Sequence, residues 1–202
     1  MEGSKLTKSL ADKLLKLKGE ARGIHFKNDA DYVSVKKGKK DLKKVEEELE
    51  RVGCPLKYSE VETLGFYPIG WRALSLLAIK KVFNWGDEEF RELGAFTTGV
   101  SLVVRIYMKF FGSLELLLKK SPQIYNEYFT EGELHISDYD MEKGYAVVGL
   151  RGLDLHPIYC RVLEGYLEKF AKMVLKSGNT KCRETKCTFK GDDYHQFKIK
   201  WK

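Results

Sequence analysis

The C-terminal quarter of this 202-residue sequence combines side chains that can bind a metal ion. The residues concerned are Cys160, Cys182, Glu184, Cys187 and His195. Zinc prefers four tetrahedral ligands drawn from thiolate, imidazole and carboxylate groups. Because all four positions would then be filled by protein, we expect a structural zinc site with no open position for catalysis.

These side chains need a closing hairpin and a helix to position them. We expect strands near 181–190 and 195–201, with a turn at Gly191 and Asp192. On such a hairpin Cys182 and Glu184 point to one face, because they lie two residues apart. Cys160 lies on a predicted helix over 156–176, whose start must then pack against the hairpin.

These residues are also compatible with a site that binds no metal. Cys160 can be a small buried apolar residue, Cys187 an inward strand residue and His195 an exposed one. The spacing between Cys182 and Cys187 is looser than that of a usual metal-binding knuckle.

The rest of the chain predicts an α+β fold. We expect an amphipathic helix over 6–17, an extended piece over 21–26, a polar helix over 40–52, and a helical layer over 67–128. The period then changes to two, which indicates an antiparallel hairpin over 134–148. This order predicts a helical layer packed on an antiparallel sheet. We expect one compact unit, with residues 1–58 as an N-terminal extension and residues 59–202 as the main body.

Composition and charge exclude several classes of protein. The net charge is +7, and residues 176–202 are the only densely basic segment, with 8 Lys and Arg against 3 Asp and Glu. No recognition motif accompanies this charge, so we do not expect a nucleic-acid partner. The sequence shows no signal-peptide core and no stretch apolar enough for a membrane span. Four cysteines fit a reducing compartment, and we expect a cytoplasmic protein.

Two motifs resemble a known family. The run Glu184-x-x-Cys187-x-x-x-Gly191-x-x-x-His195-x-Phe197-x-Ile199 looks like the closing signature of the 4-vinyl reductase domain family, also called hydrocarbon-binding domains. The upstream run Cys160-x-x-x-x-Gly165-Tyr166 resembles that family's helix motif. Related domains serve as sensors in aromatic-responsive transcription activators. The fold is shared with TRAPP tethering subunits and haem nitric-oxide-binding domains.

The resemblance implies a ligand set for the metal. Carried over position by position, the zinc ligands are Cys160, Glu184, Cys187 and His195. His195 occupies the position at which the family has its final cysteine, and histidine is also a competent zinc ligand. Cys182 is an extra thiol that could replace Glu184.

The resemblance also implies that part of the apolar helical layer encloses a small apolar or aromatic ligand. The candidate ligand-binding residues are Phe83, Trp85, Phe96, Tyr107, Phe111 and Tyr139. The alternative is that these residues form core and homodimer contacts. The Tyr-x-Ser-x-Arg clamp of the haem-binding relatives is absent, so haem is not expected.

We therefore expect a ligand-binding sensory domain that forms a homodimer and signals to a separate partner. An adaptor of the tethering-subunit type is the alternative. A tetrapyrrole vinyl reductase is a weaker one, because no nucleophile, phosphate-loop or dinucleotide fingerprint occurs. We expect no catalytic residue.

Overall fold

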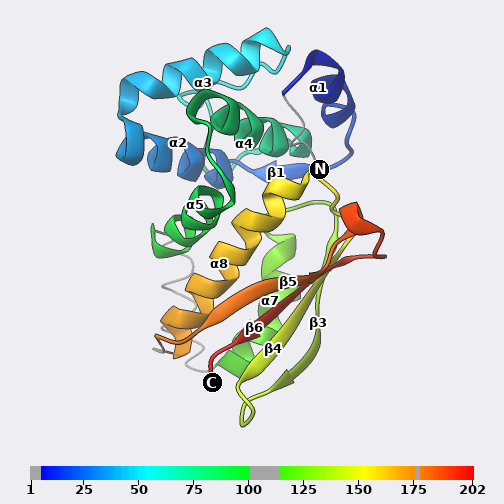
Figure 1. Cartoon of the computed structure of the whole chain (residues 1–202). Helices are drawn as coiled ribbons and strands as arrows, with labels where there is room; N and C mark the ends of the chain where they lie inside the picture. Colours follow the sequence, from blue (N-terminus) through cyan, green and yellow to red (C-terminus); the bar gives the residue numbers. More distant parts are fainter. Residues whose placement is uncertain (1–5, 101–113, 176–177) are drawn as a thin grey trace. The chain divides into compact units, whose positions relative to one another are not determined.

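The computed structural model describes residues 6–100, 114–175 and 178–202. Its internal contacts divide the chain into two units, residues 1–89 and residues 90–202. Figure 1 shows the elements of both units coloured along the sequence. The described helices include none that could cross a bilayer. The boundary that we expect at residue 58 stays a prediction.

The first unit is mostly helical. Its elements are α1 (Lys8–Leu14), β1 (Glu20–Arg22), α2 (Ile24–Lys37), α3 (Lys39–Arg51), β2 (Phe66–Pro68) and α4 (Ile69–Phe83). Strands β1 and β2 form a small antiparallel sheet. The core includes a buried ion pair between Asp29 of α2 and Arg72 of α4, and Ser75 donates a hydrogen bond to the same carboxylate. A buried charge requires such partners, because its desolvation is costly.

The second unit is built on a four-stranded antiparallel sheet. The strands are β3 (Glu133–Asp140), β4 (Tyr145–Arg151), β5 (Lys181–Lys186) and β6 (His195–Lys200), in the spatial order β3-β4-β6-β5. Alternate residues of β6 are buried, and His195, Phe197 and Ile199 face inward. One face of the sheet therefore carries the core of this unit.

Helices α7 (Leu114–Asn126) and α8 (Pro157–Leu175) cover that inner face (Figure 1). Helix α5 (Asp87–Val100) crosses α8 at very close range. A Cβ atom added at Gly94 would lie 2.0 Å from the carbonyl oxygen of Val162, and one at Gly165 would lie 1.9 Å from that of Arg91. The two backbones can approach this closely because neither glycine has a side chain.

The predicted α+β class, with helices packed on an antiparallel sheet, is confirmed. The strand predicted over 181–190 is shorter in the structure: β5 ends at Lys186, and a 3₁₀ turn spans Thr188–Lys190. The extended piece predicted over 21–26 is β1 followed directly by α2, a helix that the sequence pattern did not indicate.

Candidate metal centre and apolar cavity

Four side chains meet where the start of α8 packs against the β5–β6 hairpin. They are Cys160, Glu184, Cys187 and His195, and each offers one ligand atom within 4.8 Å of all the others. Cys160, Cys187 and His195 are 2–3% exposed. The structure thus gathers the four residues that the sequence singled out, in a group that could hold a metal ion.

Local backbone features bring Cys187 and His195 together. A bulge lies between Glu184 and Lys186 on β5, and the 3₁₀ turn follows directly after Cys187. Gly191 then adopts a φ of 97°, a left-handed conformation that favours glycine. Asp192 closes the loop, because its carboxylate accepts a hydrogen bond of 2.8 Å from the Cys187 N–H.

Hydrogen bonds connect the four side chains to one another. His195 Nδ1 lies 3.1 Å from Glu184 Oε1 and 3.6 Å from Cys160 Sγ. His195 Nε2 lies 3.0 Å from the Thr188 hydroxyl and 3.2 Å from Asp154 Oδ1. The imidazole is therefore oriented from both of its nitrogens, as is usual for a metal-binding histidine.

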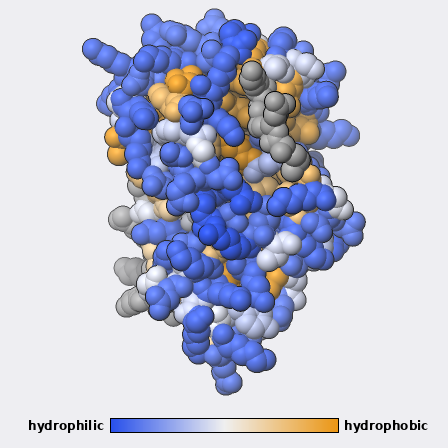
Figure 2. Space-filling model, viewed as in Figure 1, coloured by the Kyte–Doolittle hydropathy of each residue, from blue (hydrophilic) through white to orange (hydrophobic). Residues whose placement is uncertain are grey.

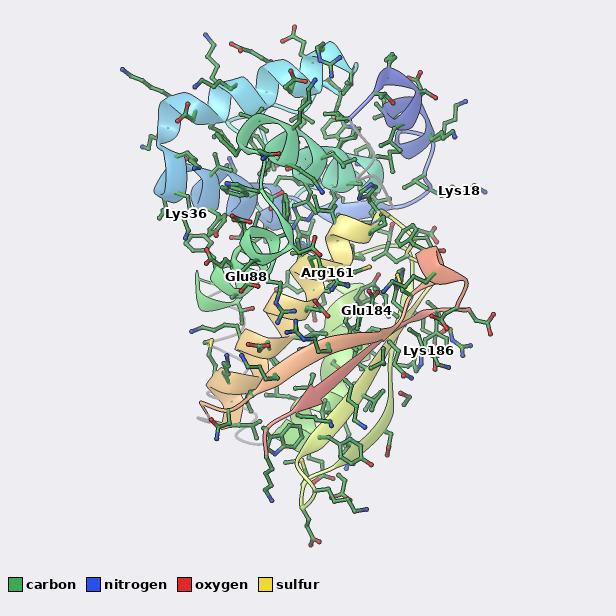
Figure 3. All side chains as sticks on the ribbon, in the orientation of Figure 1. Lys18, Lys36, Glu88, Arg161, Glu184 and Lys186 are labelled. Atoms are coloured by element: carbon green, nitrogen blue, oxygen red, sulfur yellow. The ribbon has the colours of Figure 1, made fainter. Side chains whose placement is uncertain are left out.

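A network of charged side chains surrounds the cluster (Figure 3). Arg161 donates to Glu184 Oε2 at 2.6 Å and to Glu164 Oε2 at 2.8 Å. Arg91 of α5 donates to the same oxygen of Glu164 at 2.6 Å. Glu164 Oε1 in turn accepts the backbone N–H of Glu184 at 2.7 Å, which satisfies a donor on the edge strand β5. This network was not predicted from the sequence, because its charged residues resemble those of a solvated helix face.

The environment of the cluster raises the pKa of its thiols and lowers the pKa of its carboxylate. Burial raises the pKa of the Cys160 and Cys187 thiols, and the Glu184 carboxylate raises both further. Burial alone would also raise the pKa of Glu184. Hydrogen bonds from His195, Cys160 and Cys187, together with the Arg161 charge, hold that pKa below its ordinary value. A metal ion bound here would displace the thiol protons.

Cys182, the possible substitute ligand, is not among the four clustered residues. Its side chain is fully buried in the core of the second unit, on the strand position opposite Ile199. Its backbone N–H donates to Glu168 of α8.

A small cavity lies in the second unit between the sheet and its helices. Its volume is about 50 Å³, and its lining is almost entirely apolar. The lining residues are Leu117, Leu118, Ser121, Leu134, Ile136, Ala146, Val148, Leu167, Phe170, Ala171, Ile199 and Trp201. The hydroxyl of Ser121 already donates to the carbonyl oxygen of Leu118 at 2.8 Å. The described lining therefore favours an apolar occupant.

Of the aromatic residues predicted to bind a ligand, the four that the structure describes do not line this cavity. Phe83 and Trp85 pack against each other with ring centroids 5.4 Å apart, and Phe96 lies on α5. Tyr139 donates to Glu115 at 3.4 Å. Tyr107 and Phe111 lie outside the described residues.

Comparisons with known proteins establish the fold. No family model matches the sequence, and no curated protein matches it. Among solved structures, an H-NOX protein from S. oneidensis in the Fe(II)NO state has a TM-score of 0.66 at 14% identity, with 90% of this chain and 99% of that chain covered. The unliganded Fe(II) H-NOX protein from K. algicida has a TM-score of 0.63 at 15% identity, with 90% and 96% covered.

A third structure concerns the modulation of heme redox potential through porphyrin distortion. It has a TM-score of 0.57 at 13% identity, with 89% of this chain and 99% of that chain covered. The expected fold, shared with haem nitric-oxide-binding domains, is therefore confirmed. The resemblance to 4-vinyl reductase domains finds no support, and neither do the adaptor and reductase alternatives.

The expected zinc cofactor is corrected by these comparisons. Two of the similar structures are described as H-NOX proteins in Fe(II) states, and the third is described by its heme redox potential, so these neighbours point to haem rather than zinc for this fold. The two closing motifs suggested zinc because thiolate, imidazole and carboxylate at close spacing are its preferred ligands.

Proposed function

We propose that this chain is a small-molecule-binding sensory domain whose ligand is a small apolar molecule held in the cavity of the second unit. The observation that carries the proposal is the cavity itself, which is lined by residues of α7, α8 and the inner face of the sheet. Protein interiors are normally packed without voids larger than a water molecule. An apolar void within a core stays dry and takes up small apolar molecules.

The similar structures suggest haem as a ligand, but haem needs a larger pocket and a nearby axial ligand such as histidine. Cofactor pockets measure roughly 300–1,000 Å³, and the cavity measures about 50 Å³. None of the chain's histidines lines it: His25 lies on α2, His135 on β3, His156 before α8, and His195 in the cluster with Cys160. Haem does not fit the described residues, and the proposal uses no haem chemistry.

Helix α7 gives the cavity a means of responding to its ligand. Leu117, Leu118 and Ser121 of this helix face the cavity. Pro122 follows them inside the helix and has no N–H to donate to the Leu118 carbonyl. The Ser121 hydroxyl donates to that carbonyl instead. The helix is thus weakest beside the cavity, and a ligand that binds one arrangement of α7 better would shift its population.

The proposal includes a metal-ion site at the start of α8, formed by Cys160, Glu184, Cys187 and His195. A mixed set of thiolate, imidazole and carboxylate suits a divalent transition-metal ion. Bound there, the ion would join α8 to the β5–β6 hairpin, and α8 and β6 both contribute residues to the lining of the cavity. Homodimer formation and a separate signalling partner remain predictions.

The test is a thermal-shift titration with two apolar probes of different size, together with two variants of opposite effect on the cavity. We expect xenon under pressure to raise the melting temperature of the wild-type protein and to have no effect on Ala171→Phe, whose ring occupies the cavity. Leu118→Ala enlarges the cavity and should bind benzene, which the wild-type protein binds poorly because an apolar cavity that takes benzene measures about 150 Å³. Equal responses of all three proteins to both probes would contradict the proposal.

A further inference from the structure

The outer face of the four-stranded sheet gathers positive charge on two neighbouring strands. Strand pairing places Arg183 of β5 opposite Lys198 of β6, and Lys181 opposite Lys200. Lys186 pairs with Gln196 on the same face. Like charges directly opposite each other on a sheet are destabilising. These five side chains, Lys181, Arg183, Lys186, Lys198 and Lys200, are named the basic strip below.

Few carboxylates within the described residues neutralise the basic strip. Lys181 lies 3.8 Å from Glu168, while Arg183, Lys198 and Lys200 form no ion pair in the described part of the chain. The acids on this face, Glu133, Asp138 and Asp140, belong to β3 at the far edge of the sheet. Asp138 accepts from the Tyr145 hydroxyl, and Asp140 pairs with Lys143.

Two partly exposed tyrosines flank the basic strip. Tyr145 lies opposite Lys200 in the sheet, and the Lys198 ammonium lies 4.9 Å from its ring centroid. The Tyr194 ring lies under Arg151 and Lys186, each 4.8 Å from its centroid. Figure 2 shows hydrophilic residues over the region where β5 and β6 lie in Figure 1.

We propose that this face of the sheet binds single-stranded nucleic acid, with the backbone phosphates along the basic strip and bases stacked on Tyr145 and on Tyr194 with its cations. Proteins that bind single strands combine a positively charged track with aromatic platforms. Single-strand-binding modules also use an open four-stranded sheet for this purpose. A duplex would instead need an element that enters a groove, and the described part of this face carries none.

This proposal departs from the expectation drawn from sequence that nucleic acid is not a partner. Counting charges along the chain cannot reveal that Arg183 and Lys198 are cross-strand neighbours, because that depends on the register of β5 against β6. The proposal does not depend on the cavity ligand or on the metal site.

The test measures binding of fluorescein-labelled oligo(dT) and oligo(U), each about 15 nucleotides long, by fluorescence anisotropy. Five phosphate contacts predict a slope of about −3.5 for log K against log salt, or about 100-fold weaker binding between 50 and 200 mM salt. The double variant Arg183→Glu with Lys198→Glu should weaken binding at least tenfold. The matched control, Lys39→Glu with Lys40→Glu on α3, changes the net charge equally and should bind as the wild-type protein does.

Three results would overturn the proposal: no binding at 50 mM salt, equal loss in the control variant, or equally tight binding of polyglutamate, which would identify an acidic protein as the partner. Light scattering at the same salt provides one more check. Self-association that is lost in the Arg183→Glu and Lys198→Glu variant, without oligonucleotide binding, would assign the face to a second copy of the chain instead.

Discussion

Arg161 of α8 donates one hydrogen bond to Glu184 and another to Glu164, at 2.6 and 2.8 Å. It thereby orients a carboxylate of the proposed metal site without belonging to that site. Such outer partners fix the direction of a ligand before the ion arrives, and their loss typically weakens metal binding by about 10–100-fold.

Arg161→Gln should accordingly weaken metal binding while the protein stays folded. The reason is that Glu184 loses its charged partner but keeps the backbone contact between its N–H and Glu164. Titration with Co²⁺, followed by absorption spectroscopy, measures the affinity. Arg183→Gln, an exposed change on the same strand, is the control. Equal affinities for both variants would show that Arg161 does not position Glu184.

Addition of a divalent transition-metal ion should stabilise the protein through the cluster. At a free ion concentration of about 100 times the dissociation constant, the gain is about 2.7 kcal/mol, or a melting temperature higher by roughly 5–10 °C. Cys187→Ser should abolish this gain. Cys54→Ser removes a buried free thiol of the first unit and should keep it. A metal-dependent shift of equal size in both variants would place the ion elsewhere.

Gly165→Ala should destabilise the protein by about 1–3 kcal/mol, because the added methyl group would meet the backbone of α5 at the Arg91 carbonyl. Gly99→Ala in α5 is the matched control, since a Cβ there meets no atom of the described residues within 4 Å. Alanine is also the better helix former, so the control should be neutral or slightly stabilised. Chemical denaturation measures both, and similar unfolding free energies would refute the close crossing of α5 and α8.

His25 should make the protein less stable in acid. Its burial, and next the Arg72 charge, lower its pKa from 6.5 to about 3. The unfolded chain therefore binds a proton between about pH 6.5 and pH 3 that the folded protein does not. Stability contributed by the neutral imidazole is present above pH 6.5 and falls as the pH drops, by about 1 kcal/mol per pH unit. His25→Gln should flatten this dependence, and denaturation at several pH values compares the two slopes.

The clustering of Glu184, Cys187 and His195 could be predicted in part, because it depends on local spacing. Cys187, Gly191 and His195 fall on one hairpin, and residue types and turn chemistry fix their relation. Cys160 had to come from elsewhere in the chain, and the family motif supplied it. Helix α2 was missed because it buries polar residues, Asn28 and Asp29, so its sequence lacks an apolar stripe.

The cavity could not be predicted at the level of residues. Large aromatic residues were expected to line it, but those in the described part of the chain pack elsewhere. The lining consists of aliphatic residues such as Leu118, Val148 and Ala171, which ordinary core positions also use. A void depends on how side chains from separate elements meet, and a single sequence does not specify that.

A crystal structure of the wild-type protein under xenon pressure tests most directly whether the cavity of the second unit holds a small apolar molecule. Xenon enters dry apolar cavities, and its electron density locates the site without regard to function. We expect xenon in the second unit between Leu118, Val148 and Ala171, and none there in Ala171→Phe. A wild-type structure with side chains filling that space and no xenon would contradict the claim that this domain holds a small apolar molecule.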